Sequence, residues 1–327
     1  MRALLAIALA ATALWGGYWY VGARAIEVAV VQWFAEQPPG VASNAGVSVQ
    51  GIPNRFDLTV TEPILTDPVS GIAWKAPFAQ VYAMTWKPWH VIAALPSGQE
   101  ITLADQVVRV ASAKIIASVL LHPGKELTLN ETVAEAHGVV LTSTAGWEIG
   151  VEKALASTRE DVTRGNTHRL GLALTGIAPD AGLMAALADT DLPTRVEEIF
   201  IDAHAGFSAP LDRFMAQSQP RLLLLELNEA RVGWGALRFS AKGTLTAGPD
   251  GLAQGEIALR VDGWRRLPKL LVALGLVKPD IAPTLERALE VVAAQGGDLD
   301  VVQMVLKCAD GQMSLGPLPL GPAPQMF

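Results

Sequence analysis

Residues 3–21 read ALLAIALAATALWGGYWYV and contain no charged side chain. A helix needs about 20 predominantly apolar residues to cross the hydrocarbon core of a bilayer, so this stretch is just long enough. Its C-terminal end is rich in aromatic residues, namely Trp15, Tyr18, Trp19 and Tyr20. Because Trp and Tyr favour the membrane–water interface, the stretch predicts one transmembrane helix that anchors the chain.

A cleavable secretory signal is the alternative interpretation of this segment. Arg2 and the terminal amine give a small positive region, and Val21-Gly22-Ala23 offers small residues for cleavage. However, the apolar run is longer than the usual core of a signal, and helical spacing continues at Ile26, Val30 and Trp33. The sequence therefore favours an uncleaved anchor helix, which together with its periplasmic extension covers residues 1–36. Either interpretation places the rest of the chain outside the cytoplasm, and the anchor predicts a single-pass inner-membrane protein whose bulk is periplasmic.

The composition limits the classes of partner. Of the 327 residues, 50% are hydrophobic and only 17% are charged, against about a quarter in typical globular domains. The net charge is −7 and the basic residues are scattered, so no stripe exists to follow a nucleic-acid backbone. The single cysteine, Cys308, permits neither an intramolecular disulfide nor a multi-thiolate metal site. It follows an apolar run, and we expect a buried, unreactive thiol.

Residues 41–156 have the pattern of antiparallel β-structure. Phe56, Leu58 and Val60 alternate with polar residues, as in a strand that is wet on one face. Similar short stretches follow, separated by turn signals at residues 67–68, 96–98 and 122–124. No long helical pattern separates them, which favours antiparallel pairing over strand–helix–strand units.

Residues 157–327 are predicted to be a second β-rich half with helical insertions. The clearest hairpin covers residues 237–262, with residues 248–251 as its turn. Short helices are expected over residues 179–188, after a Ser208 cap, after an Asp262 cap, and over residues 284–295. In the third of these helices Leu267, Leu270, Leu271 and Leu274 are expected to face inward. The Gly/Pro-rich tail from Gly316 is expected to lack regular structure.

These patterns together predict a mainly β (α+β) fold. A transmembrane helix is followed by a large, curved, antiparallel sheet with one apolar face, and a few short helices occur in the C-terminal half. The predicted division is into residues 1–36, 41–156 and 157–327.

Residues 51–58, Gly-Ile-Pro-Asn-Arg-Phe-Asp-Leu, resemble a bacterial family. Trp74-Lys75-Ala76-Pro77, the break at residues 95–98 and the closing residues 315–320 add to the likeness. The chain is similar to the domain-of-unknown-function 2125 proteins of alphaproteobacteria over nearly its whole length. Because that family has no established activity, the resemblance implies a location and a fold but no site residues.

Residues 243–245, 250–252 and 255–259 are also similar to the hairpin repeats of AsmA-like envelope proteins. That resemblance implies a membrane-anchored periplasmic protein with a long curved sheet, an apolar groove and a part in moving phospholipid. The motif is short, and a shared fold does not by itself fix a function.

The sequence offers few groups for chemistry. The histidines, His90, His122, His137, His168 and His204, are spread along the chain without metal-ligand spacing. The carboxylate pairs at residues 189 and 191 and at residues 298 and 300 follow predicted helices, where turns and caps explain them. Phosphate-binding loops and a nucleophile elbow are missing from the sequence. We therefore predict no catalytic, cofactor-binding or metal-ligating residues, and a protein that is not an enzyme.

Two sets of apolar residues are candidates for a groove or interface. Trp86 and Trp89 stand beside Lys87 and His90 and could line a pocket mouth or contact a bilayer. The alternative is an edge strand broken by Pro88, with its indoles packed on the core. The second set comes from the apolar face of the predicted hairpin and consists of Phe239, Leu245, Ile257 and Leu259.

The sequence supports three functional hypotheses. The leading one is a protein that binds or guides membrane lipid or another apolar ligand in envelope biogenesis, because apolar strand faces outnumber the helices available to cover them. The second is a scaffolding protein that recruits an envelope protein partner. The third is a hydrolase, which would require a convergent polar pocket.

Overall fold

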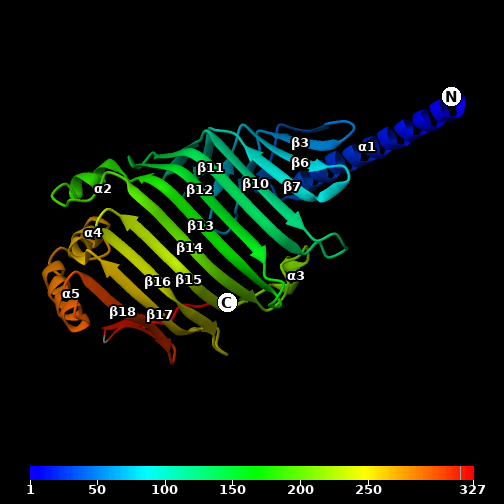
Figure 1. Cartoon of the computed structure of the whole chain (residues 1–327). Helices are drawn as coiled ribbons and strands as arrows, with labels where there is room; N and C mark the ends of the chain where they lie inside the picture. The colour runs from blue at the N-terminus through cyan, green and yellow to red at the C-terminus, as the bar shows by residue number, and fades with distance from the viewer. Residues whose placement is uncertain (317) are drawn as a thin grey trace. The chain divides into compact units, whose positions relative to one another are not determined.

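The computed structural model describes residues 1–316 and 318–327, which divide into two compact units. The first unit comprises Met1–Pro123 and Thr132–Gly146, and the second comprises Gly124–Glu131 and Trp147–Phe327. The sequence-based division at residue 157 stays a prediction. Within each unit every strand pairing is antiparallel, which confirms the predicted mainly β fold (Figure 1).

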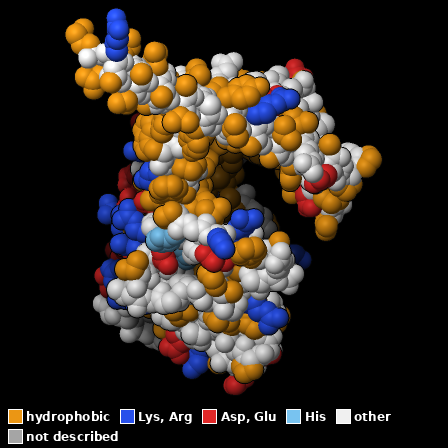
Figure 2. Space-filling view, turned by 90° about the vertical axis from the view of Figure 1, so that its right-hand side faces the viewer, with side chains coloured by type: hydrophobic (Ala, Val, Ile, Leu, Met, Phe, Trp, Pro, Cys, Tyr) orange, Lys and Arg blue, Asp and Glu red, His pale blue; other side chains and the backbone are white. Residues whose placement is uncertain are grey.

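The first unit begins with α1 (Arg2–Glu36), so the N-terminal helix extends through residue 36 as the sequence predicts. Among residues 1–316 and 318–327, α1 is the one helix that is long and apolar enough to cross a membrane. Within α1, all of which the structure describes, Ala23 is the one buried residue. Figure 2 shows hydrophobic side chains along this helix near the top of the view.

The strands of the first unit form two hydrogen-bonded ribbons. In one ribbon the order is β2 (Gly46–Gln50), β3 (Arg55–Thr61), β6 (Phe78–Met84), β7 (Lys87–Leu95) and β10 (Lys114–Leu121). In the other it is β1 (Ala42–Ser43), β4 (Ile64–Thr66), β5 (Ala73–Lys75), β8 (Gln99–Thr102), β9 (Val107–Ala111) and β11 (Leu129–Ser143).

The chain passes between these ribbons at bends that carry proline. Pro63, Pro77 and Pro96 stand at the β3–β4, β5–β6 and β7–β8 junctions, where a missing N–H interrupts no ladder. Because β6 pairs with β7 while β5 pairs with β8, residues 96–98 are a bend within a long strand and not the expected turn. β7 is paired on both sides, with β6 and β10, so the edge-strand interpretation of Pro88 is wrong.

The aromatic end of α1 packs on the first unit. Trp15 Nε1 donates to the Pro53 carbonyl at 3.0 Å, Trp19 Nε1 to the Arg55 carbonyl at 2.6 Å, and the Tyr18 hydroxyl to the Thr85 carbonyl at 2.8 Å. The Trp19 ring stacks on Phe56 with centroids 6.4 Å apart. These aromatic side chains therefore fix α1 to the β2–β3 and β6–β7 turns.

The second unit is a meander in which each strand pairs with the next. Its strands are β12 (Glu148–Glu160), β13 (Thr167–Ala178), β14 (Val196–Phe207), β15 (Leu222–Trp234), β16 (Leu237–Ala247), β17 (Ala253–Asp262), β18 (Val301–Ala309), β19 (Gln312–Leu315) and β20 (Leu318–Pro322). Figure 1 shows β12 to β18 side by side and curved. Register shifts in the β14–β15 and β15–β16 pairs mark bulges, which add twist. The predicted hairpin is confirmed as β16 and β17, and β20 corrects the expectation of an irregular tail.

Short helices of the second unit lie between its strands. They are α2 (Ala181–Ala186), α3 (Met215–Ser218), the 3₁₀ turn η1 (Trp264–Arg266), α4 (Leu267–Ala273) and α5 (Ala282–Gly296). Asp180 Oδ1 accepts a hydrogen bond from Gly182 N at 2.8 Å and so caps α2. Gly297 ends α5 with a φ of 79°, a conformation that glycine adopts without strain.

Three details of the helix predictions are wrong. Ser208 does not cap α3, because its hydroxyl accepts from Arg221 N, 13 residues later, and Phe214 precedes the helix. Asp262 lies in β17, and its carboxylate binds Arg260. Leu274 follows α4 and is exposed, since the helix ends one residue earlier than its apolar spacing suggested.

The contact between α1 and β3 makes a prediction about glycine. A Cβ at Gly22 would lie 2.7 Å from Phe56 Cζ, whereas a Cβ at Gly16 would meet nothing within 4 Å. We expect Gly22→Ala to lower the free energy of unfolding of the detergent-solubilised chain by about 1–3 kcal/mol through overpacking. Gly16→Ala should be neutral or slightly stabilising, because Ala favours helix. Denaturation followed by tryptophan fluorescence tests this, and equal stability of the two variants would contradict it.

Candidate functional site

Most of the apolar side chains of β13 to β18 lie on one face of the sheet of the second unit. Pairing aligns them in rows that cross β13 to β18. The first row is Leu174, Ile199, Val232, Phe239, Val261 and Val302. The second row is Leu172, Ile201, Ala230, Ala241, Leu259 and Met304. The third row is Leu170, Ala203, Leu227, Gly243, Ile257 and Leu306. The fourth row is His168, Ala205, Leu225, Leu245, Gly255 and Cys308.

Helices cover the first row. All its members belong to, or pack against, a core cluster that includes Leu187, Trp264, Leu289 and Ala293. Trp264 is 1% exposed, and its Nε1 donates to the Leu299 carbonyl at 3.1 Å, so this buried indole is fully satisfied. Figure 1 shows α4 and α5 at this end of the strands.

The C-terminal segment covers part of the fourth row. Leu245 and Cys308 form a smaller core with Ala253 and Ala323. Burial also raises the pKa of the Cys308 thiol. The prediction of a buried cysteine is therefore confirmed.

The second and third rows lie between these two cores. Of their members, Met304 packs on the rim of the first core and Ile257 on the rim of the second. Ala203 and Ala241 are buried, and the larger side chains are half-buried. A band of partly accessible apolar surface thus runs across the middle of this face.

An apolar cavity of about 700 Å³ opens beside this band. The second-row residues Leu259 and Met304 line it, together with residues of α4, α5 and the end of β19. Its further lining residues are Ala258, Leu267, Leu271, Leu285, Ala288, Leu289, Val292, Gln295, Gln303, Val305, Leu315, Gly316 and Leu318. Ligand pockets commonly have volumes of about 300–1,000 Å³, so the cavity is large enough for a small molecule or part of a lipid.

The position of the cavity follows from the unequal lengths of β18 and β19. Their pairing begins at Leu306, so the preceding part of β18 faces α5 and has no partner on that side among the described strands. The apolar stripe of α5 completes the wall. Gln295 and Gln303 are the polar side chains in the lining, and no charged side chain of the described residues takes part. This site can bind apolar groups and offers amides for a polar end.

The structure places the residues of the predicted site in different surroundings. Leu259 lines the cavity, and Phe239 packs on the first core. Leu245 lies in the second core and Ile257 packs against it. The four share the apolar face, but Leu259 alone among them lines the cavity.

The tryptophans of the predicted site belong to the first unit. Trp86 stands in the β6–β7 turn and is 56% exposed, whereas Trp89 lies on β7 and is half-buried. Their assignment to a groove or interface stays a prediction. The sequence predicts that Leu271 faces inward and that residues 284–295 form a helix, but it does not identify Leu271, Leu285 and Val292 as walls of a cavity. The amphipathic stripes of α4 and α5 were the available signal.

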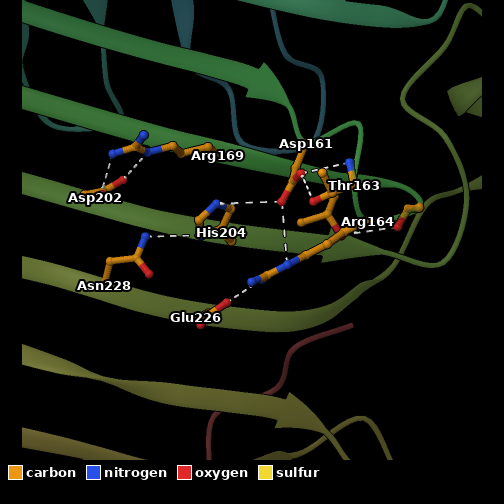
Figure 3. Close-up of polar contacts among 10 residues, drawn as sticks. Asp161, Thr163, Arg164, Arg169, Asp202, His204, Glu226 and Asn228 are labelled. Atoms are coloured by element: carbon orange, nitrogen blue, oxygen red, sulfur yellow. Dashed lines mark hydrogen bonds and ion pairs between the residues drawn. The ribbon is translucent and has the colours of Figure 1, made fainter.

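The opposite face of the second unit carries a network of charges. Arg169 on β13 binds Asp202 on β14 through two hydrogen bonds, of 2.7 and 3.0 Å. Arg164, in the β12–β13 turn, binds Glu226 on β15 (Figure 3). In each pair the two opposite charges neutralise each other across strands, and the Arg164–Glu226 pair holds the turn against the sheet.

His204 lies within this network but lacks the geometry of a catalytic base. Its Nε2 is 3.9 Å from Asp161 Oδ2, and its Nδ1 is 3.1 Å from the Asn228 amide nitrogen. The Thr163 hydroxyl donates to Asp161 at 2.6 Å and so is not directed at His204. No activated nucleophile results from this arrangement.

The carboxylate pairs singled out in the sequence serve as structural contacts. Asp191 binds Arg266 of η1, and Asp300 binds Arg265. Asp298 Oδ1 accepts a hydrogen bond from Asp300 N at 3.0 Å. The Arg266 guanidinium lowers the pKa of Asp191.

The resolved pKa shifts of carboxyl groups are all downward, and hydrogen bonds are the largest cause of each. The groups are Asp67, Glu135, Asp161, Asp180, Asp191 and Asp202. A carboxylic acid that donates a proton near neutral pH needs a raised pKa. These groups are therefore suited to holding ion pairs and caps.

Burial disfavours the protonated form of His168. It is 2% exposed on the apolar face, and desolvation lowers its pKa. Below the ordinary pKa of 6.5 this histidine takes up a proton in the unfolded chain more readily than in the folded chain. The free energy of unfolding therefore decreases as the pH decreases through this range. We expect the His168→Gln variant to lose less stability than the unchanged chain between pH 7 and pH 5. The two free energies of unfolding should differ in their pH slope by at most about 1.4 kcal/mol per pH unit. Chemical denaturation across that range checks it, and parallel profiles would contradict it.

The fold and the site define a β-sheet protein with one apolar N-terminal helix and an apolar cavity beside its sheet. The bacterial family described as "Uncharacterized protein conserved in bacteria (DUF2125)" matches residues 19–324, and the chain belongs to it. This confirms the predicted membership of that uncharacterised family. No curated protein and no solved structure matches the chain significantly.

Proposed function

We propose that this protein is anchored in the inner membrane, projects its bulk into the periplasm, and binds lipid or another apolar ligand without enzymatic turnover. The cavity between α4, α5 and β18 is the observation that carries the proposal. Its lining is apolar apart from two glutamines, and it continues into the half-buried second row through Leu259 and Met304. An acyl chain is the biological group that such a lining fits.

The helix α1 supports the location. It is long and apolar enough to span a bilayer, and its aromatic residues before the suggested cleavage site make tertiary hydrogen bonds to the first unit. Cleavage after Ala23 would remove these contacts. The similarity of the β16–β17 hairpin to AsmA-like repeats agrees with a role in the bacterial envelope.

A crosslinking experiment tests the ligand. Ala288 and Val291 are both exposed on α5, but only Ala288 lines the cavity. A photoreactive benzoylphenylalanine at position 288 of the full chain should form phospholipid adducts in cells with radiolabelled phosphate. The same group at position 291 should form few. Equal lipid labelling at both positions, or none at either, would refute lipid binding in the cavity.

The same experiment separates the alternatives. A discrete protein adduct at position 288 without lipid would favour scaffolding of an envelope partner. A hydrolase receives less support, because the titratable cluster around His204 lacks an activated nucleophile and lies on the face opposite the apolar rows.

The anchor makes its own prediction. We expect the protein in the membrane fraction to keep residues 1–23, because Trp15, Tyr18 and Trp19 complete the packing of the first unit. Intact mass measurement of the purified protein checks this. A mature N-terminus near residue 24 in a soluble periplasmic fraction would contradict it.

A further inference from the structure

Two turns of the first unit expose large apolar side chains beside α1. Ile52, in the β2–β3 turn, is 63% exposed, and Trp86, in the β6–β7 turn, is 56% exposed. Met84, at the end of β6, is 42% exposed. Lys87 follows Trp86 and can reach toward anionic headgroups.

Hydrogen bonds hold these turns beside Trp15 and Tyr18 of α1. The Pro53 carbonyl, next to Ile52, accepts from Trp15, and the Thr85 carbonyl, next to Trp86, accepts from Tyr18. Residues 3–14 precede this level and span roughly 18 Å at 1.5 Å per residue. A hydrocarbon core is about 30 Å thick. If α1 enters the bilayer at its first residues, the level of Trp15 and Tyr18 lies within the far leaflet.

Several backbone groups of the turns have hydrogen-bond partners within the protein. Thr85 is 1% exposed, and its N–H donates to the Asn54 carbonyl at 3.0 Å. Arg55 N donates to the Gly51 carbonyl at 3.0 Å, and the Arg55 carbonyl accepts from Trp19. Pro53 has no N–H to satisfy. Polar backbone groups near lipid must find partners within the protein, and these have done so.

We propose that the β2–β3 and β6–β7 turns insert into the bilayer interface beside α1, with Ile52 and Trp86 in contact with lipid. The first unit then lies directly on the membrane surface and is not held away from it by a free linker. The apolar surface of α1 continues into the turns, which favours a bilayer over a protein as the occupant. This inference rests on the anchoring role of α1 but not on ligand binding in the cavity.

Depth-dependent quenching tests the proposal on the full chain. Single-cysteine variants Ile52→Cys and Trp86→Cys, in a Cys308→Ala background, carry a polarity-sensitive fluorophore and are reconstituted in phosphatidylcholine–phosphatidylglycerol nanodiscs with brominated acyl chains. Val69→Cys is the matched control, because Val69 is 94% exposed in the β4–β5 turn. That turn follows Thr66, whose N–H binds the Val41 carbonyl just beyond the other end of α1. Leu9→Cys, on the exposed face of α1, reports the anchor.

We expect blue-shifted emission and strong quenching at positions 52 and 86, comparable with position 9, and neither effect at position 69. If positions 52 and 86 behave like position 69 while position 9 is quenched, the inference is wrong and the anchor stands. If position 9 is also unquenched, the anchor itself fails. Quenching at position 69 equal to that at positions 52 and 86 would also overturn the inference, because contact would not be specific to these turns.

Discussion

The second unit depends on one constraint, the alternation of side chains along paired antiparallel strands. Because neighbouring strands keep their register, most apolar residues of β13 to β18 gather on one face, and the charged residues gather on the other. Such a face must be covered or must bind something. The helices cover one end and the C-terminal segment covers part of the other. The band between them and the adjoining cavity are what this arrangement leaves accessible.

Several charged residues on the opposite face are paired with one another, which leaves the apolar face as the candidate for ligand binding. Arg169 with Asp202, and Arg231 with Glu198, pair opposite charges across neighbouring strands. Exposed pairs of this kind contribute little to stability, so they act mainly on register and solubility. The hydrogen bonds from Arg169 lower the pKa of Asp202, which leaves this carboxylate without the poised pKa of an acid–base site.

Local patterns were sufficient to predict several elements. The alternation of residues 237–262 around a Gly-Pro-Asp-Gly turn predicted β16 and β17, and the helical pattern of residues 284–295 predicted α5. Long-range contacts were not predictable in this way. Ser208 has the composition of a cap but binds Arg221, and the aromatic residues of α1 have the composition of an interface belt but also bind carbonyls of the first unit. The cavity could not be anticipated, because it depends on where β19 begins to pair with β18.

We propose that the cavity between α4, α5 and β18 holds lipid. Native mass spectrometry of the full chain, released gently from detergent after purification from its membrane, tests this most directly. We expect a protein peak that carries a phospholipid in defined stoichiometry, and we expect the Ala288→Trp variant, whose bulky side chain fills the cavity, to lose that lipid. Bare protein in every charge state, or lipid retained equally by that variant, would contradict it.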